Sequence, residues 1–94
     1  MINDRFEWDD EKARTNPIRH GGITFEEAAR VFDDLFAVGR EDHRENYGED
    51  RFVQIGSAGD RIVTVVYTMR GERIRIISAR KAEPFERRWY HEEG

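Results

Sequence analysis

The side chains best suited to chemistry in this sequence are a lysine, a histidine and several arginines. Lys12, Asn16 and His20 recur at every fourth position, so a helix would place them on one face. Arg80 lies near the end of the apolar segment Glu72–Lys81. Imidazole suits proton transfer because its unperturbed pKa lies near neutrality, and guanidinium groups suit the stabilisation of charge on a phosphorane. Such a set can cleave RNA if one group deprotonates the 2′-hydroxyl and another protonates the leaving 5′-oxygen.

Other familiar chemistries have little support in the sequence. The chain has no cysteine, which excludes disulfides and thiolate zinc sites. It also lacks a phosphate-binding glycine loop, an H-E-x-x-H helix and a G-x-S-x-G turn. Asp9, Asp10 and Glu11 are adjacent, so they point in different directions on a helix, and no partner follows at metal-ligand spacing. We therefore expect no metal site and no other cofactor.

The same features also have purely structural interpretations. A polar stripe such as Lys12 to His20 is common on the exposed face of a helix. On a regular strand Arg80 shares a face with Ile76 and Ser78, where a charge must lie at the rim of the core or be paired. A structural salt bridge at Arg80 is the simplest reading of the strand alone.

The first half of the chain contains the elements that would position the lysine and the histidine. Phe6–Trp8 is predicted to form a short strand, and a helix is predicted from about Asp9. Pro17 should kink or end that helix. A capping box at Thr24 predicts a second helix that continues to about Asp34.

The second half is predicted to supply most of the sheet and a final helix. The expected strands are Leu35–Val38 at an edge, Arg51–Ile55, Arg61–Met69 and Glu72–Lys81. Their short connections favour antiparallel neighbours. Pro84 suits the first turn of a helix over Glu83–Glu92, from which Trp89 should pack on the sheet. We predict one α+β domain over residues 1–94: an antiparallel sheet, formed by the N-terminal strand and a three- or four-stranded meander, with two N-terminal helices and one C-terminal helix.

The distribution of charge is more informative than its total. The net charge of −4 argues mildly against a nucleic-acid binder. However, acids dominate residues 41–50, whereas bases dominate residues 70–88. The sequence has no apolar run of about 18 residues and no signal peptide, so we expect a cytoplasmic protein without membrane association.

Several short motifs occur in an order that resembles one known family. They are F-E-W-D at 6–9, Lys12, N-x-x-R-H-G at 16–21, T-F-E-E-A at 24–28, R-F-V-Q-I-G at 51–56, R-I-I-S-A-R-K-A at 75–82 and E-R-R-x-Y at 86–90. Together they resemble the BrnT family, ribonuclease toxins of type II toxin–antitoxin modules with a RelE-like fold. The resemblance implies an intracellular endoribonuclease that blocks translation. It also implies a BrnA-like ribbon-helix-helix antitoxin as partner, with operator DNA bound only through the toxin–antitoxin complex.

The resemblance implies roles for particular residues. His20 would transfer protons, Arg80 would stabilise the phosphorane, and Lys12 would stabilise charge or act as the acid. The residues expected to bind RNA are Trp8, Asn16, Arg51, Arg70 and Arg75, with Trp8 stacking on a base. This catalytic hypothesis requires His20 and Arg80 to converge on one cleft. The chain departs from the family in having Arg19 where a lysine is usual and an extra glycine, Gly22, before the second helix.

Two other hypotheses remain open from the sequence. In the first, the chain is a non-catalytic interaction module that acts with an antitoxin as a transcriptional corepressor. In the second, it is an ordinary α+β domain whose arginines form salt bridges only. If the chain does cleave RNA, the acidic segment 41–50 should lie away from the RNA and face a basic antitoxin.

Overall fold

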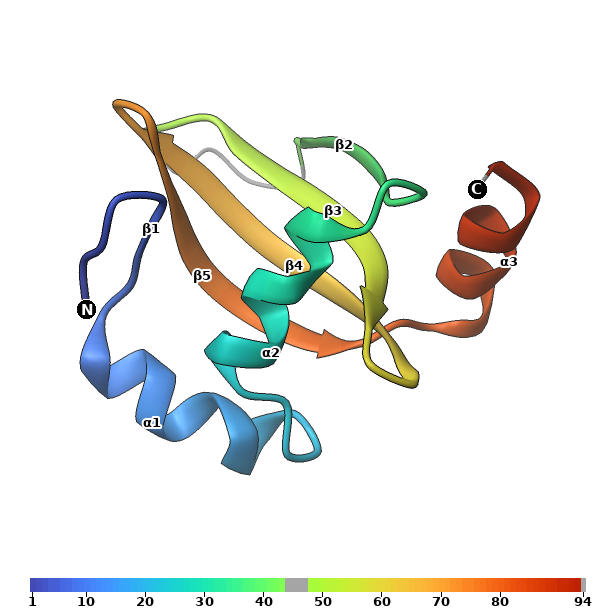
Figure 1. The fold of residues 1–94 in the computed structure, drawn as a ribbon, viewed down its shortest axis with the longest axis horizontal. Helices are drawn as coiled ribbons and strands as arrows, with labels where there is room; N and C mark the ends of the chain where they lie inside the picture. The colour runs from blue at the N-terminus through green and yellow to red at the C-terminus, as the bar shows by residue number, and fades with distance from the viewer. Residues whose placement is uncertain (44–47, 94) are drawn as a thin grey trace.

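A five-stranded sheet in the order β1-β5-β4-β3-β2 forms the centre of the protein, seen in a computed structural model that describes residues 1–43 and 48–93 (Figure 1). The strands are β1 (Phe6–Glu7), β2 (Val38–Asp42), β3 (Arg51–Ala58), β4 (Arg61–Arg70) and β5 (Arg73–Lys81). Strands β2 to β5 pair antiparallel, whereas β1 pairs parallel with β5. The predicted α+β class is confirmed, but the sheet is mixed, because the chain leaves β1 and returns to pair with it only after three other strands.

The helices lie where the sequence placed them. They are α1 (Asp10–Arg19), α2 (Phe25–Arg30), which continues as the 3₁₀ turn η1 (Val31–Asp33), and α3 (Pro84–Glu93). The N-terminal cap predicted at Thr24 forms, with Thr24 Oγ1 accepting from the amide of Glu27 at 3.0 Å. The structure adds a cap at α1, where the Asp9 side chain accepts from the amide of Lys12. Within the described part of the chain, no helix is long and apolar enough to cross a membrane.

Two local predictions are wrong. Pro17 does not end α1, because it lies in the last turn and the helix still closes through the bond from the His20 amide to the Asn16 carbonyl at 2.9 Å. The edge strand begins at Val38 rather than Leu35. Asp34 holds the preceding turn by accepting from the amide of Phe36 at 2.9 Å, and this turn leaves Leu35 95% exposed.

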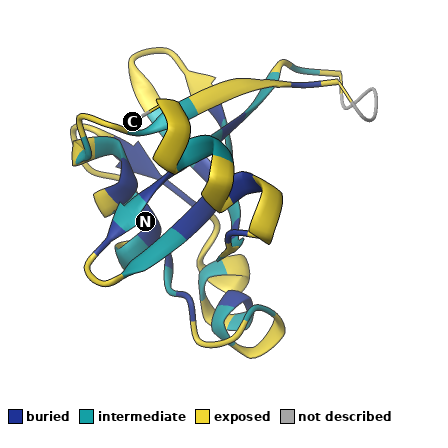
Figure 2. Ribbon diagram, turned by 90° about the vertical axis from the view of Figure 1, so that its right-hand side faces the viewer, coloured by how far each residue is buried: buried dark blue, intermediate teal, exposed yellow. Residues whose placement is uncertain are grey.

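The core has a larger and a smaller part, one on each face of the sheet. Figure 2 shows the buried residues of the central strands in dark blue. In the larger part, α2 covers side chains from β4 and β5, including Val63, Val65 and Ile76. The smaller part lies beneath α3 and contains Val53, Ile55 and Ala82. Trp89 packs against this smaller part, as predicted.

A β-bulge in β5 changes which residues share a face. Val66 pairs with Ser78 and Tyr67 pairs with Ile76, which leaves Ile77 as an extra residue in β5. The alternation of side chains is therefore reversed after Ile77. Ile76 faces the larger core, whereas Ser78 and the residues in step with it face the side of α3. The expectation that Arg80 shares a face with Ile76 is wrong for this reason.

Candidate active site

A cavity of about 210 Å³ lies between α1 and the bulged part of β5. We call it the α1–β5 cavity. Its lining residues are Lys12, Thr15, Asn16, Arg19 and His20 from the first helix and its C-cap, and Ile77 and Ser78 from the strand. Because α1 continues past Pro17, its regular spacing does bring the predicted Lys12, Asn16 and His20 to one wall.

The α1 wall of this cavity is basic. Among the described residues, the side chains of Lys12, Arg19 and His20 have no ion-pair or hydrogen-bond partner, so they are available to an anionic ligand. The other wall is formed by Ile77 and Ser78. Within residues 1–43 and 48–93 no three His, Asp or Glu side chains are grouped as they would be around a metal ion. The arrangement can therefore contact a phosphate with cations and place an imidazole beside it.

Asn16 belongs to the cavity wall, but its side chain is already engaged. Both amide hydrogens are donated to backbone carbonyls, those of Ile23 and Ala79. The residue is only 5% exposed. Its predicted contact with RNA would have to replace at least one of these buried hydrogen bonds.

Arg80 is not among the residues that line the cavity. Its guanidinium forms a bidentate ion pair with the Glu86 carboxylate. The Nη1–Oε1 distance is 2.6 Å and the Nη2–Oε2 distance is 3.1 Å. Since the bulge turns Arg80 toward α3, the structure does not bring it into the same cavity as His20. Ser78 does line the cavity, and Arg80 follows it on the same face, roughly 7 Å further along the strand.

Glu86 is the buried anchor of α3. The residue is 1% exposed and accepts hydrogen bonds from the Glu83 amide at 2.8 Å and from Thr64 Oγ1 at 3.0 Å, besides those from Arg80. Burial acts to raise the pKa of Glu86, but the hydrogen bonds from Arg80, Glu83 and Thr64 outweigh it, and the pKa is lowered. At the other end of the helix, the Tyr90 hydroxyl donates to Asp34 Oδ2 at 2.6 Å, which raises the pKa of Tyr90 to about 12.

The three other arginines expected to bind RNA are in ion pairs with acids. Arg75 contacts Glu7 at 2.5 Å, and Arg70 contacts Glu49 at 3.1 Å. Arg51 Nε lies 3.7 Å from Glu49 Oε2. Glu49 belongs to the acidic segment 41–50, part of which, residues 44–47, lies outside the described residues. In its described part, this segment contacts two of the arginines that were expected to hold RNA.

Trp8 lies in the core. It is 7% exposed, and its ring packs edge-on against Phe25 with centroids 5.6 Å apart. A base cannot stack on the Trp8 ring while it is covered in this way. The aromatic residue after β1 therefore serves packing in this structure.

Some residues of the cavity were not predicted from the sequence. Arg19 could have been found, because it lies seven positions after Lys12 and so shares its helical face. Ser78 could not, because it reaches the cavity only through the bulge at Ile77. Lys81 lies beside the turn that follows His20. A Cβ atom added to Gly21 would lie 3.9 Å from Lys81 Cδ, which shows how close this side chain is to the turn.

Comparison with known families gives a match over most of the chain. Residues 8–86 match the family described as the ribonuclease toxin BrnT of type II toxin–antitoxin systems. The matched region includes α1, the turn at His20 and all of β5, and hence both walls of the α1–β5 cavity. No curated protein matches the chain.

Proposed function

Because this chain belongs to the BrnT family of ribonuclease toxins of type II toxin–antitoxin systems, we propose that it is an endoribonuclease that cleaves RNA without a metal ion and so inhibits translation in the cytoplasm. The proposal treats residues 1–94 as one toxin domain. The observation that supports it is the α1–β5 cavity, where Lys12, Arg19 and His20 lie together without acidic partners among the described residues.

In the proposed reaction the RNA supplies its own nucleophile. The 2′-hydroxyl loses its proton, its oxygen bonds to phosphorus, and the bond from phosphorus to the 5′-oxygen breaks as that oxygen takes up a proton. His20 carries out a proton transfer, because it is the imidazole among the described residues that line the cavity. Lys12 and Arg19 stabilise the negative charge on the phosphorane. The products are a 2′,3′-cyclic phosphate and a 5′-hydroxyl.

The other arginines that the family implies are held in ion pairs, so their roles in the proposed reaction depend on how these pairs respond to RNA. Arg80 can stabilise the phosphorane only if a phosphate competes with Glu86 for its guanidinium. Arg51, Arg70 and Arg75 would bind the RNA backbone in competition with their carboxylate partners, which reduce the charge that they offer to a phosphate. The proposal therefore depends on His20 and Lys12 rather than on these arginines or on Trp8.

Incubation of the purified chain with end-labelled RNA tests the proposal. We expect cleavage to persist in excess chelator, and the products to carry cyclic phosphate ends. At RNA concentrations below saturation, the logarithm of the rate should fall with the logarithm of salt concentration with a slope of about −1.4, since two cations, Lys12 and Arg19, displace counterions from single-stranded RNA. RNA that stays intact would refute the proposed ribonuclease activity. Cleavage that chelator abolishes and a divalent cation restores would refute the metal-independent mechanism.

A second candidate function is a non-catalytic corepressor that acts with the antitoxin. It is favoured by one observation: the four arginines expected to contact RNA, Arg51, Arg70, Arg75 and Arg80, lie against carboxylates. On this hypothesis RNA stays intact in the assay above. The chain would instead strengthen the binding of the antitoxin to its operator DNA, as measured by a mobility-shift titration.

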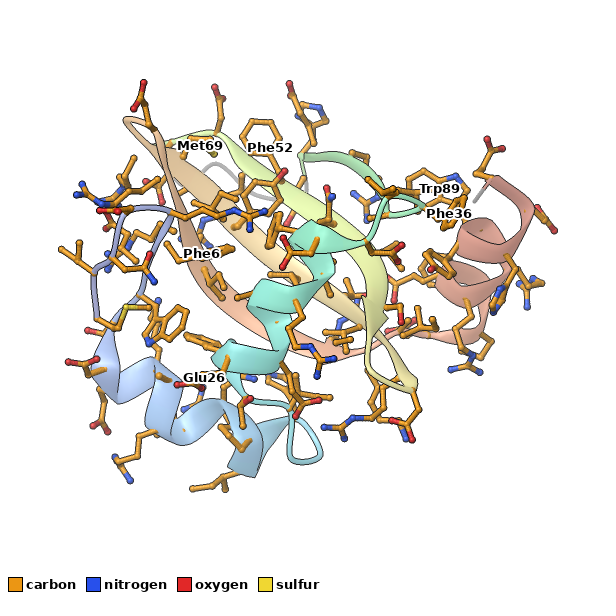
Figure 3. The ribbon with its side chains drawn as sticks, in the orientation of Figure 1. Phe6, Glu26, Phe36, Phe52, Met69 and Trp89 are labelled. Carbon is orange, nitrogen blue, oxygen red and sulfur yellow. The ribbon has the colours of Figure 1, made fainter. Side chains whose placement is uncertain are left out.

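We propose a BrnA-like ribbon-helix-helix antitoxin as the protein partner, through which alone the chain reaches operator DNA. The turn before β2 is a candidate contact, since Leu35 is 95% exposed and Phe36 is 62% exposed. Replacing both by serine should weaken antitoxin binding at least about tenfold, because exposed apolar anchors commonly dominate such interfaces. Calorimetric titration of the co-encoded antitoxin measures the effect. Met69→Ser is the matched control, as Met69 is also exposed but lies on a different part of the sheet (Figure 3). Equal affinities for both variants would contradict this assignment.

A further inference from the structure

The edge of β5 is closed by a side chain rather than by a strand. β1 pairs with β5 only at Ile74 and Arg75, so the rest of this edge has no strand neighbour in the described chain. At Ala79 the side chain of Asn16 takes that place. Asn16 Oδ1 accepts from the Ala79 amide at 3.2 Å, and Asn16 Nδ2 donates to the Ala79 carbonyl at 2.8 Å. A primary amide thus reproduces both bonds that one residue of a neighbouring strand would make.

The same amide also holds the turn that carries His20. Its second hydrogen is donated to the Ile23 carbonyl at 2.9 Å. The backbone carbonyl of Asn16 accepts from the His20 amide at 2.9 Å. The segment between residues 16 and 23 is therefore tied at both ends to Asn16, with His20 inside it. Through Ala79, this segment is tied in turn to the strand that carries Ser78.

We infer that Asn16 is a positioning residue, which sets the place of the His20 imidazole relative to the β5 wall of the cavity and does not itself bind RNA. The inference rests on the proposed ribonuclease function. Asn16 has no free amide hydrogen, and burial keeps its side chain from the ligand. Its hydrogen bonds join the two walls of the cavity. A displacement of about 1 Å between reacting groups can lower a rate by about 100-fold, so the position of His20 has a direct effect on catalysis.

Asn16→Asp tests this inference with almost no change in shape. An ionised carboxylate cannot donate hydrogen bonds to the carbonyls of Ile23 and Ala79. Its negatively charged oxygens would instead be repelled by the two carbonyl oxygens. At neutral pH we expect kcat to fall by about 100-fold and KM to change by less than about twofold, since positioning rather than RNA binding is lost. The NMR signals of the His20 ring should move from their wild-type positions.

The effect of Asn16→Asp should be partly reversed in acid. Burial beside two carbonyls raises the pKa of the introduced carboxyl, so acidification to about pH 5 restores one donated bond. The His20 signals should then approach those of wild type at the same pH.

Asn3→Asp is the matched control. Asn3 Oδ1 only accepts, from the amides of Arg5 at 2.9 Å and Phe6 at 2.7 Å, and a carboxylate keeps this role. Its kcat and its His20 signals should match wild type.

Wild-type kcat and wild-type His20 signals in Asn16→Asp at neutral pH would overturn the inference. So would a rise in KM with an unchanged kcat, which would mean that Asn16 binds RNA. If the variant unfolds at neutral pH, both measurements are made there on Asn16→Ala, which removes the same hydrogen bonds without introducing a charge; wild-type kcat and His20 signals in that variant would equally overturn the inference. The NMR comparison needs no RNA, so it tests Asn16 even if the wild-type chain proves not to cleave RNA.

Discussion

His20→Ala should lower the rate of RNA cleavage by about 100- to 10,000-fold, the usual contribution of one general acid or base. In the structure His20 caps α1 and lines the α1–β5 cavity with Lys12 and Arg19. Among the described residues that line this cavity, no second imidazole could replace it. Since substrate binding depends mainly on the neighbouring cations, the fall should appear in kcat. Single-turnover cleavage of labelled RNA measures it directly.

His43→Ala is the control for loss of an imidazole. The His43 side chain is 80% exposed, lies 3.1 Å from Glu41 and is not among the residues that line the cavity. We expect it to cleave RNA at the wild-type rate and to arrest growth on expression as the wild type does. His20→Ala should no longer arrest growth, while its urea unfolding curve stays close to that of wild type. A folded His20→Ala chain that remains fully toxic would remove His20 from the mechanism.

Arg80→Ala should destabilise the fold by about 3 kcal/mol, near the lower end of the range for a broken buried ion pair because the Arg80 side chain is 31% exposed. The substitution leaves the carboxylate of Glu86, 1% exposed, without its charged partner. Urea unfolding at neutral pH measures the loss. Arg70→Ala is the matched control for stability: its pair with Glu49 is more exposed, and such pairs contribute about 0 to 1 kcal/mol. Equal losses in the two variants would contradict the anchoring role of Arg80.

The loss caused by Arg80→Ala should depend on pH in a definite direction. In wild type the pKa of Glu86 lies below its ordinary value of 4.5, so its stabilising contribution is complete above that pH and is lost as the pH falls through the lower folded value. Without Arg80, burial instead favours the neutral carboxyl. The difference in unfolding free energy between wild type and variant should therefore be largest near neutrality and shrink in acid. A difference that grows in acid would contradict this account.

A double variant separates the structural role of Arg80 from a catalytic one. Arg80→Met with Glu86→Gln removes both charges and keeps the carbonyl-type acceptor for the Glu83 amide and Thr64. Neutral replacements of buried pairs often recover the stability lost by breaking them. If the stable double variant cleaves RNA at the wild-type rate, Arg80 is structural only. If it stays folded but loses cleavage, Arg80 acts on the phosphorane as the family resemblance implies.

The sequence by itself determined the features that depend on near neighbours in the chain. Asp9 and Thr24 begin their helices through bonds to residues three positions later, so their roles are readable from local spacing. The same periodicity placed Lys12 and His20 on one wall. Short connections between the last three strands determined that they pair antiparallel.

Only the tertiary structure decided what the distant partners of these side chains are. One extra residue at Ile77 reverses the faces of β5, and this places Ser78 in the cavity while it turns Arg80 toward Glu86. Burial of Trp8 against Phe25 and the bonds from Asn16 to Ala79 likewise join segments that local patterns treat separately. The physical reason is that side chains alternate along a strand, so one extra residue moves every later side chain to the opposite face. The bulge that adds this residue arises from pairing between strands, which local sequence patterns do not show.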